Sequence, residues 1–321
     1  MGFRSDNQGR AESLQHPLEP TPSCILTSDS VDGKNFVGLL KLPSMEWDQP
    51  VIDERELART YDGGAYADPW TAVLDYQAVM RYASHHPDNG SYAISTALDI
   101  PRSRVRPWTE NKSKPDPVRG IETARDCGWL DATYRDTEFT VLNTLVANIF
   151  SGGSIDAERY QPWFALNHRH RRSHVIDVLE ETGLGFEFYH EDDAGRATEV
   201  RPTEGATVLG RTLAVLGAPL GSKTEIEDLT LPWYLEEAPY ETREMFVLAY
   251  LANRAIHHRD KDTVHIQEER PQSYLDELAA LIEDVSKEAV TVGEQQVTIS
   301  AAAARSLGLQ PRYRTPATTS E

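Results

Sequence analysis

The spacing of apolar residues divides the chain into a polar beginning and a longer, regularly patterned remainder. Residues 1–67 are rich in Ser, Asp, Gly, Pro and Gln, and their one apolar run is residues 36–42 (FVGLLKL). A segment of this composition rarely buries enough apolar surface to fold. We therefore expect residues 1–67 to be mostly disordered, with 36–42 as a strand or a docking peptide. From Pro69 onward apolar residues recur at helical spacing, and Asp68 is suited to cap that helix.

Residues 68–134 are predicted to form a compact helical domain. Residues 91–110 (SYAISTALDIPRSRVRPWTE) have apolar positions spaced as in two helices that pack around a tight turn, here at Asp99. This spacing resembles that of a helix-turn-helix. The second helix is expected to begin at Pro101 and to end after Arg106, because Pro107 lacks a backbone donor.

The second of these helices has the chemistry of a DNA-recognition helix. Arginine can form bidentate hydrogen bonds with guanine in the major groove, and lysine contacts phosphate. The residues expected to bind DNA here are Arg102, Ser103, Arg104, Arg106, Lys112 and Lys114. A charged helix face also occurs on proteins that never touch DNA, so a solvated surface is the alternative.

After residue 134 the same order of predicted elements occurs twice. Residues 135–220 are predicted as helix 136–150, strand 161–167, helix 173–182, strands 186–190 and 198–201, and helix 207–216. After a connector at 221–240, residues 241–309 are predicted as helix 242–254, strand 263–267, helix 273–285, strands 290–292 and 296–299, and helix 301–307. Residues 310–321 are expected to be a flexible tail. Two similar units in one chain predict a monomer with a pseudo-two-fold interface.

Two apolar helical segments that lead into strands suggest a family. Residues 145–155 (LVANIFSGGSI) and 250–256 (YLANRAI) resemble the two signature helices of the LAGLIDADG homing endonucleases. Residues 221–223 (GSK) and 231–233 (LPW) resemble the linker between repeats in that family. The resemblance covers residues 137–308. It implies an α+β fold in which a helix-turn-helix domain precedes two pseudo-symmetric LAGLIDADG-type αββαββα units, whose signature helices cross at the core.

The catalytic positions of that family lack their carboxylates in this chain. In the family each signature helix ends in an Asp or Glu that holds a divalent metal ion, and the matching positions here are Gly152 and Arg254. Neither residue offers a carboxylate oxygen to a hard cation. The resemblance thus implies no catalytic residue, no metal and no cofactor, and Arg254 is expected to form an ion pair instead. An active endonuclease with relocated acids, such as Asp156 and Glu158, is the alternative.

The resemblance also implies a DNA-binding saddle. The expected saddle and rim residues are Gln161, Trp163 and Asn167 on the first strand, Arg169, Arg171 and Arg172 after it, and His258, Arg259 and Lys261 in the second unit. Histidines at 168, 170, 257 and 258 have no carboxylate partners at ligand spacing, so we do not expect a metal site. A solvated loop is the alternative for these basic clusters.

Composition modifies this picture in two ways. The net charge is −19, and the chain has seven Lys against twenty-five Arg, which is typical of proteins adapted to a salty cytoplasm. A moderately acidic mesophilic protein is the alternative. Such acidity argues against a nucleic-acid partner, whereas the local clustering of Arg argues for one. The two cysteines, Cys24 and Cys127, predict neither a disulfide framework nor a zinc site.

These observations predict a non-cleaving, sequence-specific DNA-binding protein that regulates transcription. No apolar run is long enough to span a membrane and the N-terminus has no signal core, so we expect a cytoplasmic protein with no membrane partner. Its expected partners are double-stranded DNA and, through residues 1–67, another protein. Besides an active endonuclease, an RNA-binding splicing helper and a purely protein-binding module stay open.

Overall fold

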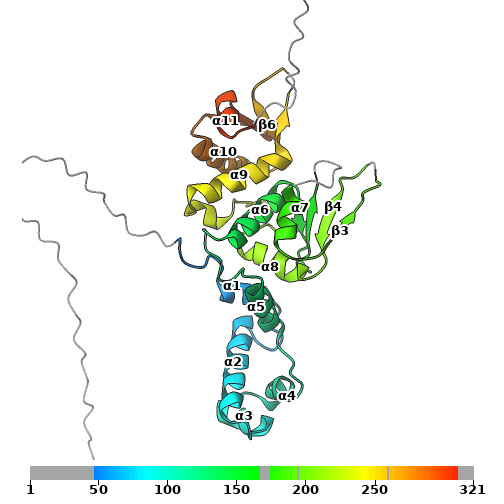
Figure 1. Ribbon diagram of the computed structural model, residues 1–321, viewed down its shortest axis with the longest axis vertical. Coiled ribbons are helices and arrows are strands. Elements are labelled where there is room, and N and C mark those ends of the chain that lie inside the picture. The colour runs from blue at the N-terminus through cyan, green and yellow to red at the C-terminus, as the bar shows by residue number, and fades with distance from the viewer. Residues whose placement is uncertain (1–46, 167–173, 194, 259, 310–321) are drawn as a thin grey trace, which may run out of the picture. The chain divides into compact units, whose positions relative to one another are not determined.

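The computed structural model describes residues 47–166, 174–193, 195–258 and 260–309 (Figure 1). Several predicted features lie outside this range. They are residues 36–42, the DNA-binding candidates Asn167, Arg169, Arg171, Arg172 and Arg259, and the tail 310–321. No helix among the described residues is long and apolar enough to cross a membrane.

Five helices make up the first described part of the chain. They are α1 (Glu54–Arg59), α2 (Pro69–His85), α3 (Ser91–Leu98), α4 (Arg102–Glu110) and α5 (Asp116–Asp126). Asp68 caps α2 as predicted, because its carboxylate accepts a hydrogen bond from the Trp70 N–H.

The segment before α2 is more ordered than its composition predicts. Within residues 47–67, helix α1 is capped by Asp53 and buries Leu57 and Ala58 completely. The expectation of disorder for residues 1–67 is therefore wrong for α1. A six-residue helix with two buried apolar residues is too short to produce a recognisable hydrophobic period. Helix α1 is instead stabilised by packing on α2 and α5.

Helices α3 and α4 are joined by a tight turn, as predicted. Asp99 adopts the left-handed conformation that ends α3, with φ of 54°. Helix α4 continues through Pro107 to Glu110, so the prediction that it ends after Arg106 is wrong. Burial of Val105 and Trp108 against α2 outweighs the hydrogen bond that proline removes.

The rest of the described chain is two units with the same order of elements. The first contains α6 (Thr137–Ser151), β1 (Ser154–Ile155), β2 (Pro162–Ala165), α7 (His174–Glu181), β3 (Phe186–Tyr189), β4 (Glu199–Pro202) and α8 (Ala206–Val215). A short 3-10 helix, η1 (Trp233–Glu236), lies in the connector. The second unit contains α9 (Tyr240–Arg254), β5 (Ile256–His257), β6 (Val264–Gln267), α10 (Gln272–Ser286), β7 (Val290–Gly293), β8 (Gln296–Ile299) and α11 (Ala301–Ser306).

Each unit contains one antiparallel sheet, and the two sheets have the same strand order. The orders are β1-β2-β4-β3 in the first unit and β5-β6-β8-β7 in the second. The pairing registers also match: Ser154 opposite Trp163 in the first sheet corresponds to Ile256 opposite His265 in the second, 102 positions later. The same shift relates Gly152 to Arg254, so these residues are structural equivalents. The predicted α+β class is confirmed.

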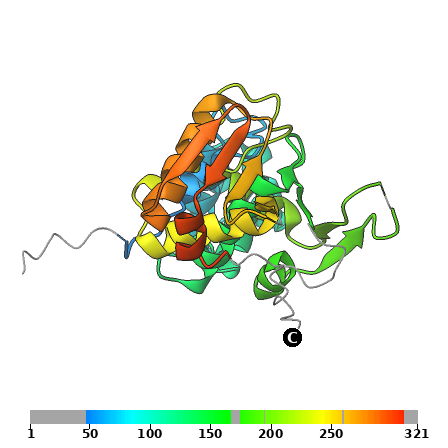
Figure 2. The same cartoon turned by 90° about the horizontal axis from the view of Figure 1, so that it is seen from above.

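Helices α6 and α9 form the centre of the two units. They contact each other more extensively than any other pair of elements, and every α6 residue from Val141 to Ser151 is buried. Each sheet buries alternate residues against the helices, among them Phe164 and Val200 in the first sheet and Ile266 and Val297 in the second. The intervening residues form the outer face of each sheet. Figure 2 shows the strands of the second sheet side by side.

The helical segment is attached to the first unit through α8. The guanidinium of Arg211 in α8 lies between the rings of Tyr61 and Tyr160, 4.0 and 3.9 Å from their centroids. It also donates a hydrogen bond to the carbonyl of Thr60. An arginine stacked on both faces is a directed, partly desolvated contact, so it fixes α1 against α8.

Candidate nucleic-acid interface

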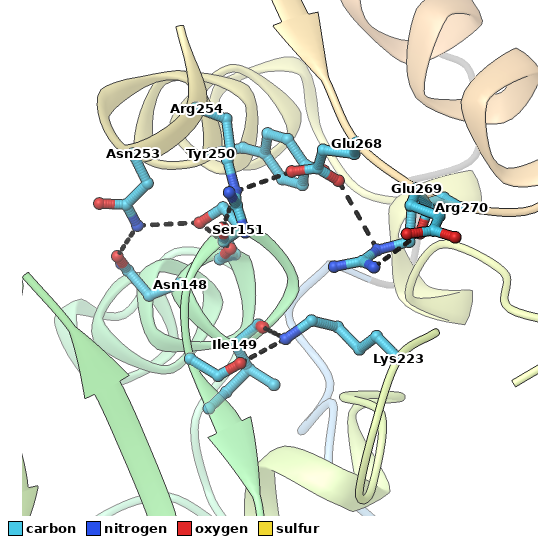
Figure 3. A network of polar contacts seen from close by, with 12 residues as sticks. Asn148, Ile149, Ser151, Lys223, Tyr250, Asn253, Arg254, Glu268, Glu269 and Arg270 are labelled. Atoms are coloured by element: carbon cyan, nitrogen blue, oxygen red, sulfur yellow. Dashed lines mark hydrogen bonds and ion pairs between the residues drawn. The ribbon is translucent and has the colours of Figure 1, made fainter. Parts of the chain in front are cut away.

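The ends of α6 and α9 meet in a polar network (Figure 3). Arg254 donates a hydrogen bond to the carbonyl of Ser151 and forms an ion pair of 2.8 Å with Glu268. The amide of Asn253 donates to the Ser151 hydroxyl, at 2.8 Å, and to the side-chain oxygen of Asn148. The two helix ends are therefore joined by side chains of the chain itself, and Arg254 forms the ion pair that we expected.

Glu268 is the one acid of this network that lies in the interior. Only 2% of its side chain is exposed. Besides Arg254, its carboxylate faces Arg270 at 3.7 Å and accepts a hydrogen bond of 2.7 Å from the Tyr250 hydroxyl. Tyr274 in turn donates to Tyr250. Burial raises the pKa of Glu268 above its ordinary value, although Arg254 and Tyr250 oppose this rise.

A second cation occupies the end of α6. Lys223, from the connector, donates to the carbonyls of Ile149, at 2.7 Å, and Gly153. Burial, with a smaller contribution from Arg270 and Arg254, lowers the pKa of Lys223 to about 8. Most of the lysine is still protonated at pH 7, so its charge offsets the negative end of the helix dipole.

This arrangement does not suit a divalent metal ion. A hard cation needs several anionic or neutral oxygen ligands, whereas these carbonyls already bind Lys223 and Arg254 and the one buried carboxylate faces two arginines. Among the described residues no three His, Cys, Asp or Glu side chains are grouped so that they could hold a metal. The alternative acids Asp156 and Glu158 do not supply such a site. Asp156 accepts hydrogen bonds from the backbone N–H groups of Glu158 and Arg159 in a turn.

The two glycines after α6 have different roles. A Cβ on Gly153 would lie 2.5 Å from the carbonyl of Trp163, so only glycine fits there. A Cβ on Gly152 would have its nearest neighbour, the carbonyl of Ala165, at 3.6 Å, which is ordinary contact. Packing therefore does not exclude a larger residue at position 152.

The outer face of the first sheet carries aromatic side chains, and its arginine forms an ion pair with an acid of the same strand. Arg201 of β4 lies between Trp163 of β2 and Tyr189 of β3, 3.6 and 4.1 Å from their ring centroids. It also forms an ion pair of 2.9 Å with Glu199. Gln161 donates to the Pro202 carbonyl. A cleft of roughly 390 Å³ opens here, lined in part by Gln161, Trp163 and Arg201. Two predicted residues, Gln161 and Trp163, thus line a surface cleft.

Apart from the exposed Ile256 of β5, which lies opposite His265, the outer face of the second sheet is polar and uncharged. His265 of β6 lies within hydrogen-bond distance of Thr298 (3.1 Å) and Gln296 (2.8 Å), both on β8. Gln267 and Thr291 are exposed on the same face. Burial, followed by the nearby His258 and Lys261, lowers the pKa of His265 below its ordinary value, which favours the neutral ring.

The predicted second-unit residues flank this face. The His258 ring stacks edge-on to His265, with centroids 5.1 Å apart, and Lys261 is exposed three residues later. Sequence reasoning missed His265, Gln296 and Thr298, although the two-residue alternation of β6 and β8 is a signal that could have revealed them.

Four of the six predicted residues of α4 and the loop after it, Arg102, Arg104, Arg106 and Lys114, contact other residues of the protein. Arg102 lies 3.3 Å from the Ser91 hydroxyl, Arg106 pairs with Glu110 at 2.8 Å, and Lys114 pairs with Glu122 at 2.6 Å. Ser103 and Lys112 are exposed.

Arg104 departs most from expectation. Its guanidinium lies 4.1 Å from the centre of the Tyr66 ring and donates to the Ala65 carbonyl, so it points back toward the chain and not outward. Attraction between the cation and the aromatic ring explains this.

The structure thus separates the predicted residues into three places: Gly152 and Arg254 at the helix ends, the sheet residues on two outer faces, and the α4 residues on the helical segment. No protein-family model matches the chain, and no curated protein matches it either.

Proposed function

We propose that the protein binds duplex DNA without cutting it and recognises its site through the outer faces of the two sheets. The repeated αββαββα order, the identical strand orders and the central α6–α9 pair support a LAGLIDADG-type fold for residues 137–308. The same proposal includes a helix-turn-helix role for α3 and α4 and a regulatory function.

The observation that carries the proposal is the pair of protein cations at the helix ends. Lys223 and Arg254 bind the carbonyls that terminate α6, and Arg254 also neutralises Glu268. In a two-metal phosphodiester cleavage, carboxylates at this place hold cations over the phosphate. Here the cations are covalently part of the chain. The helix ends are thus held by cations of the chain itself, and the chain keeps the surfaces on either side of them.

The second sheet offers groups that can recognise bases without net positive charge. Gln, Thr and neutral His side chains donate and accept hydrogen bonds to base edges in the major groove, which admits β-strands. Gln267, Thr291 and Thr298 lie on one such face. This suits an acidic chain with a net charge of −19, because phosphate-driven affinity falls steeply with salt and a Debye length of about 3 Å at 1 M salt screens long-range attraction.

Helix α4 contributes a second surface in this proposal. The ion pair between Arg106 and Glu110 is largely exposed, and such pairs contribute only about 0–1 kcal/mol. Arg106 can therefore exchange Glu110 for a phosphate or a guanine at small cost. Arg104, stacked on Tyr66, is better suited to holding α4 in place.

Two glutamines five positions apart test the sheet surface. Gln267 is exposed on the outer face, whereas Gln272 is exposed at the start of α10. Duplexes are first selected from a random pool with the unaltered protein at its working salt. Gln267→Ala should bind these duplexes about tenfold more weakly, as expected for one lost base contact. Gln272→Ala should bind them like the unaltered protein. Failure to enrich any duplex sequence, or equal binding by both variants, contradicts the proposal. Preferential enrichment of structured RNA would also contradict it.

A further inference from the structure

The two units differ in size at two pairs of equivalent positions on the central helices. In the second unit the cleft between α6, α9 and α10 is filled by Phe150, Phe246 and Tyr274, all fully buried. The Phe150 ring lies 6.1 Å from Phe246 and 6.0 Å from Tyr274, measured between centroids. The 102-position shift between units relates Phe246 to Thr144 and Phe150 to Ala252. Two small residues therefore replace two phenylalanines on the first-unit side.

An apolar groove of roughly 370 Å³ lies at that place, between α6, α7 and α9. Its apolar lining includes Val141, Val178, Met245, Leu248 and Ala249, and both Thr144 and Ala252 border it. Met245 is 40% exposed within this apolar lining. The groove is the counterpart of a cleft that aromatic rings fill on the other side of the molecule.

The helices that form the groove are strongly acidic. The structure describes α6, α7 and α9 in full. Their acids are Glu138, Asp177, Glu180, Glu181, Glu241 and Glu244. The Lys and Arg residues of these helices are Arg243 and Arg254, and both form ion pairs, with Asp284 and Glu268 respectively. Among these acids Glu181 lines the groove itself, so a cation at the rim of the groove would have that carboxylate to approach.

We propose that this groove binds an amphipathic helix of a partner protein, with an aromatic anchor on its apolar face and Lys or Arg beside it. The aromatic anchor follows from Phe150, Phe246 and Tyr274 filling the equivalent cleft. The basic flank follows from Glu181 in the lining and from the negative charge of the three helices. From Met245 to Ala252 the α9 wall is about 10 Å long, at about 1.5 Å per residue. That length accommodates two turns of a helix with anchors at i, i+4 and i+7. The surface is separate from the sheet faces assigned to DNA.

Two methionines of equal exposure provide the test. Met245 lies in the groove at 40% exposure, and Met80 lies on α2 at 39%. The probe is a fluorescein-labelled 16-residue helical peptide of Ala and Lys with Phe at i and i+4 and Leu at i+7. Its affinity is measured by fluorescence anisotropy at low salt. Met245→Glu should weaken binding about tenfold, as loss of an interface anchor does, whereas Met80→Glu should change it less than about twofold. Circular dichroism checks that both variants are folded.

Two peptide controls and one filling variant complete the test. Replacing both Phe by Ala, or all Lys by Glu, should each abolish binding, and Thr144→Phe should occupy the groove and do the same. Equal binding by Met245→Glu and Met80→Glu, binding of the Glu peptide as tight as that of the Lys peptide, or no binding of the Lys peptide at all overturns the proposal. A dimer seen in sedimentation and lost in Met245→Glu also overturns it, because the groove would then bind a second copy.

Discussion

Removing Arg254 should destabilise the protein much more than removing an arginine from an exposed ion pair of the same length. Arg254 and Arg106 both form ion pairs of 2.8 Å. The partner of Arg254 is Glu268, whose side chain is 2% exposed, whereas the partner of Arg106 is 42% exposed. Removing one member of a buried pair leaves a charge without its counter-charge, which costs about 3–5 kcal/mol.

The value for Arg254→Ala should lie at the low end of that range. Arg270 and Tyr250 still face the Glu268 carboxylate, and Arg254 is itself 38% exposed. We therefore expect a loss of about 3 kcal/mol in the free energy of unfolding. At about 2 °C per kcal/mol for a domain of this size, the midpoint falls by about 6 °C. Arg106→Ala should lower the free energy by less than about 1 kcal/mol.

A double-mutant cycle identifies the cause of the loss. Glu268→Gln removes the buried charge, so Arg254→Ala should cost about 1–2 kcal/mol less in the Glu268→Gln background than in the unaltered protein. Urea unfolding followed by circular dichroism at constant salt measures all four proteins. If Arg254→Ala costs no more than Arg106→Ala, or if the two changes are additive, the network does not stabilise the helix ends as argued.

Three further predictions concern Lys223, the helix ends and the basic residues expected to bind DNA. The folded pKa of Lys223, about 8, lies below its ordinary value of 10.5, so the unfolded chain binds more protons between these values. The free energy of unfolding should therefore rise from pH 8 to 10.5 by about 3 kcal/mol relative to Lys223→Met. Urea unfolding of both proteins across this window measures the rise. A difference in unfolding free energy between the two proteins that stays constant with pH would contradict the prediction. Gly152→Asp together with Arg254→Asp should destabilise the helix pair and not produce Mg²⁺-dependent cutting, because the new acid at 254 faces Glu268; Gly152→Ala, which has room, is the control for stability. Replacing Arg106, whose exposed ion pair can be exchanged for a base, by Ala should relax base preference by about 1–3 kcal/mol. Replacing Arg169, Arg171 and Arg172 should instead weaken all duplexes alike and reduce the salt slope by about one per lost phosphate contact. Binding measured over a salt series separates the two, and unchanged specificity in the Arg106 variant would make α4 a structural brace.

The order of elements was predictable from sequence because burial imposes a period. The second unit shows this well: predicted helices at 242–254 and 273–285 correspond to α9 and α10, and predicted strands at 263–267 and 296–299 correspond to β6 and β8. One face of each element packs against the core, so its apolar spacing is set by its own geometry. Helix α1 was missed because it is too short for its apolar residues to show this spacing.

The contacts of the site were less predictable. The sequence positions of Gly152 and Arg254 indicated that the carboxylates are missing, but not that Lys223 from the connector binds the end of α6. Glu268 lies next to Glu269 in the sequence, and only the fold distinguishes a buried, paired acid from its neighbour. Likewise, the arginines of α4 look alike in the sequence, yet Arg104 stacks on Tyr66 and Arg106 pairs with Glu110. Such partners come from distant segments, and periodicity carries no information about them.

The central claim is that the protein binds duplex DNA at a specific site and leaves it intact. The most direct measurement uses one duplex, selected from a random pool at working salt, and follows binding and strand cleavage in the same samples with Mg²⁺, Mn²⁺ or a chelator. We predict saturable binding that an unrelated duplex does not compete away, the same affinity with and without metal, and no cleavage of either strand, because Lys223 and Arg254 hold the helix ends. Specific cleavage products that vanish in chelator, or no duplex bound above the background of random sequence, would contradict the account.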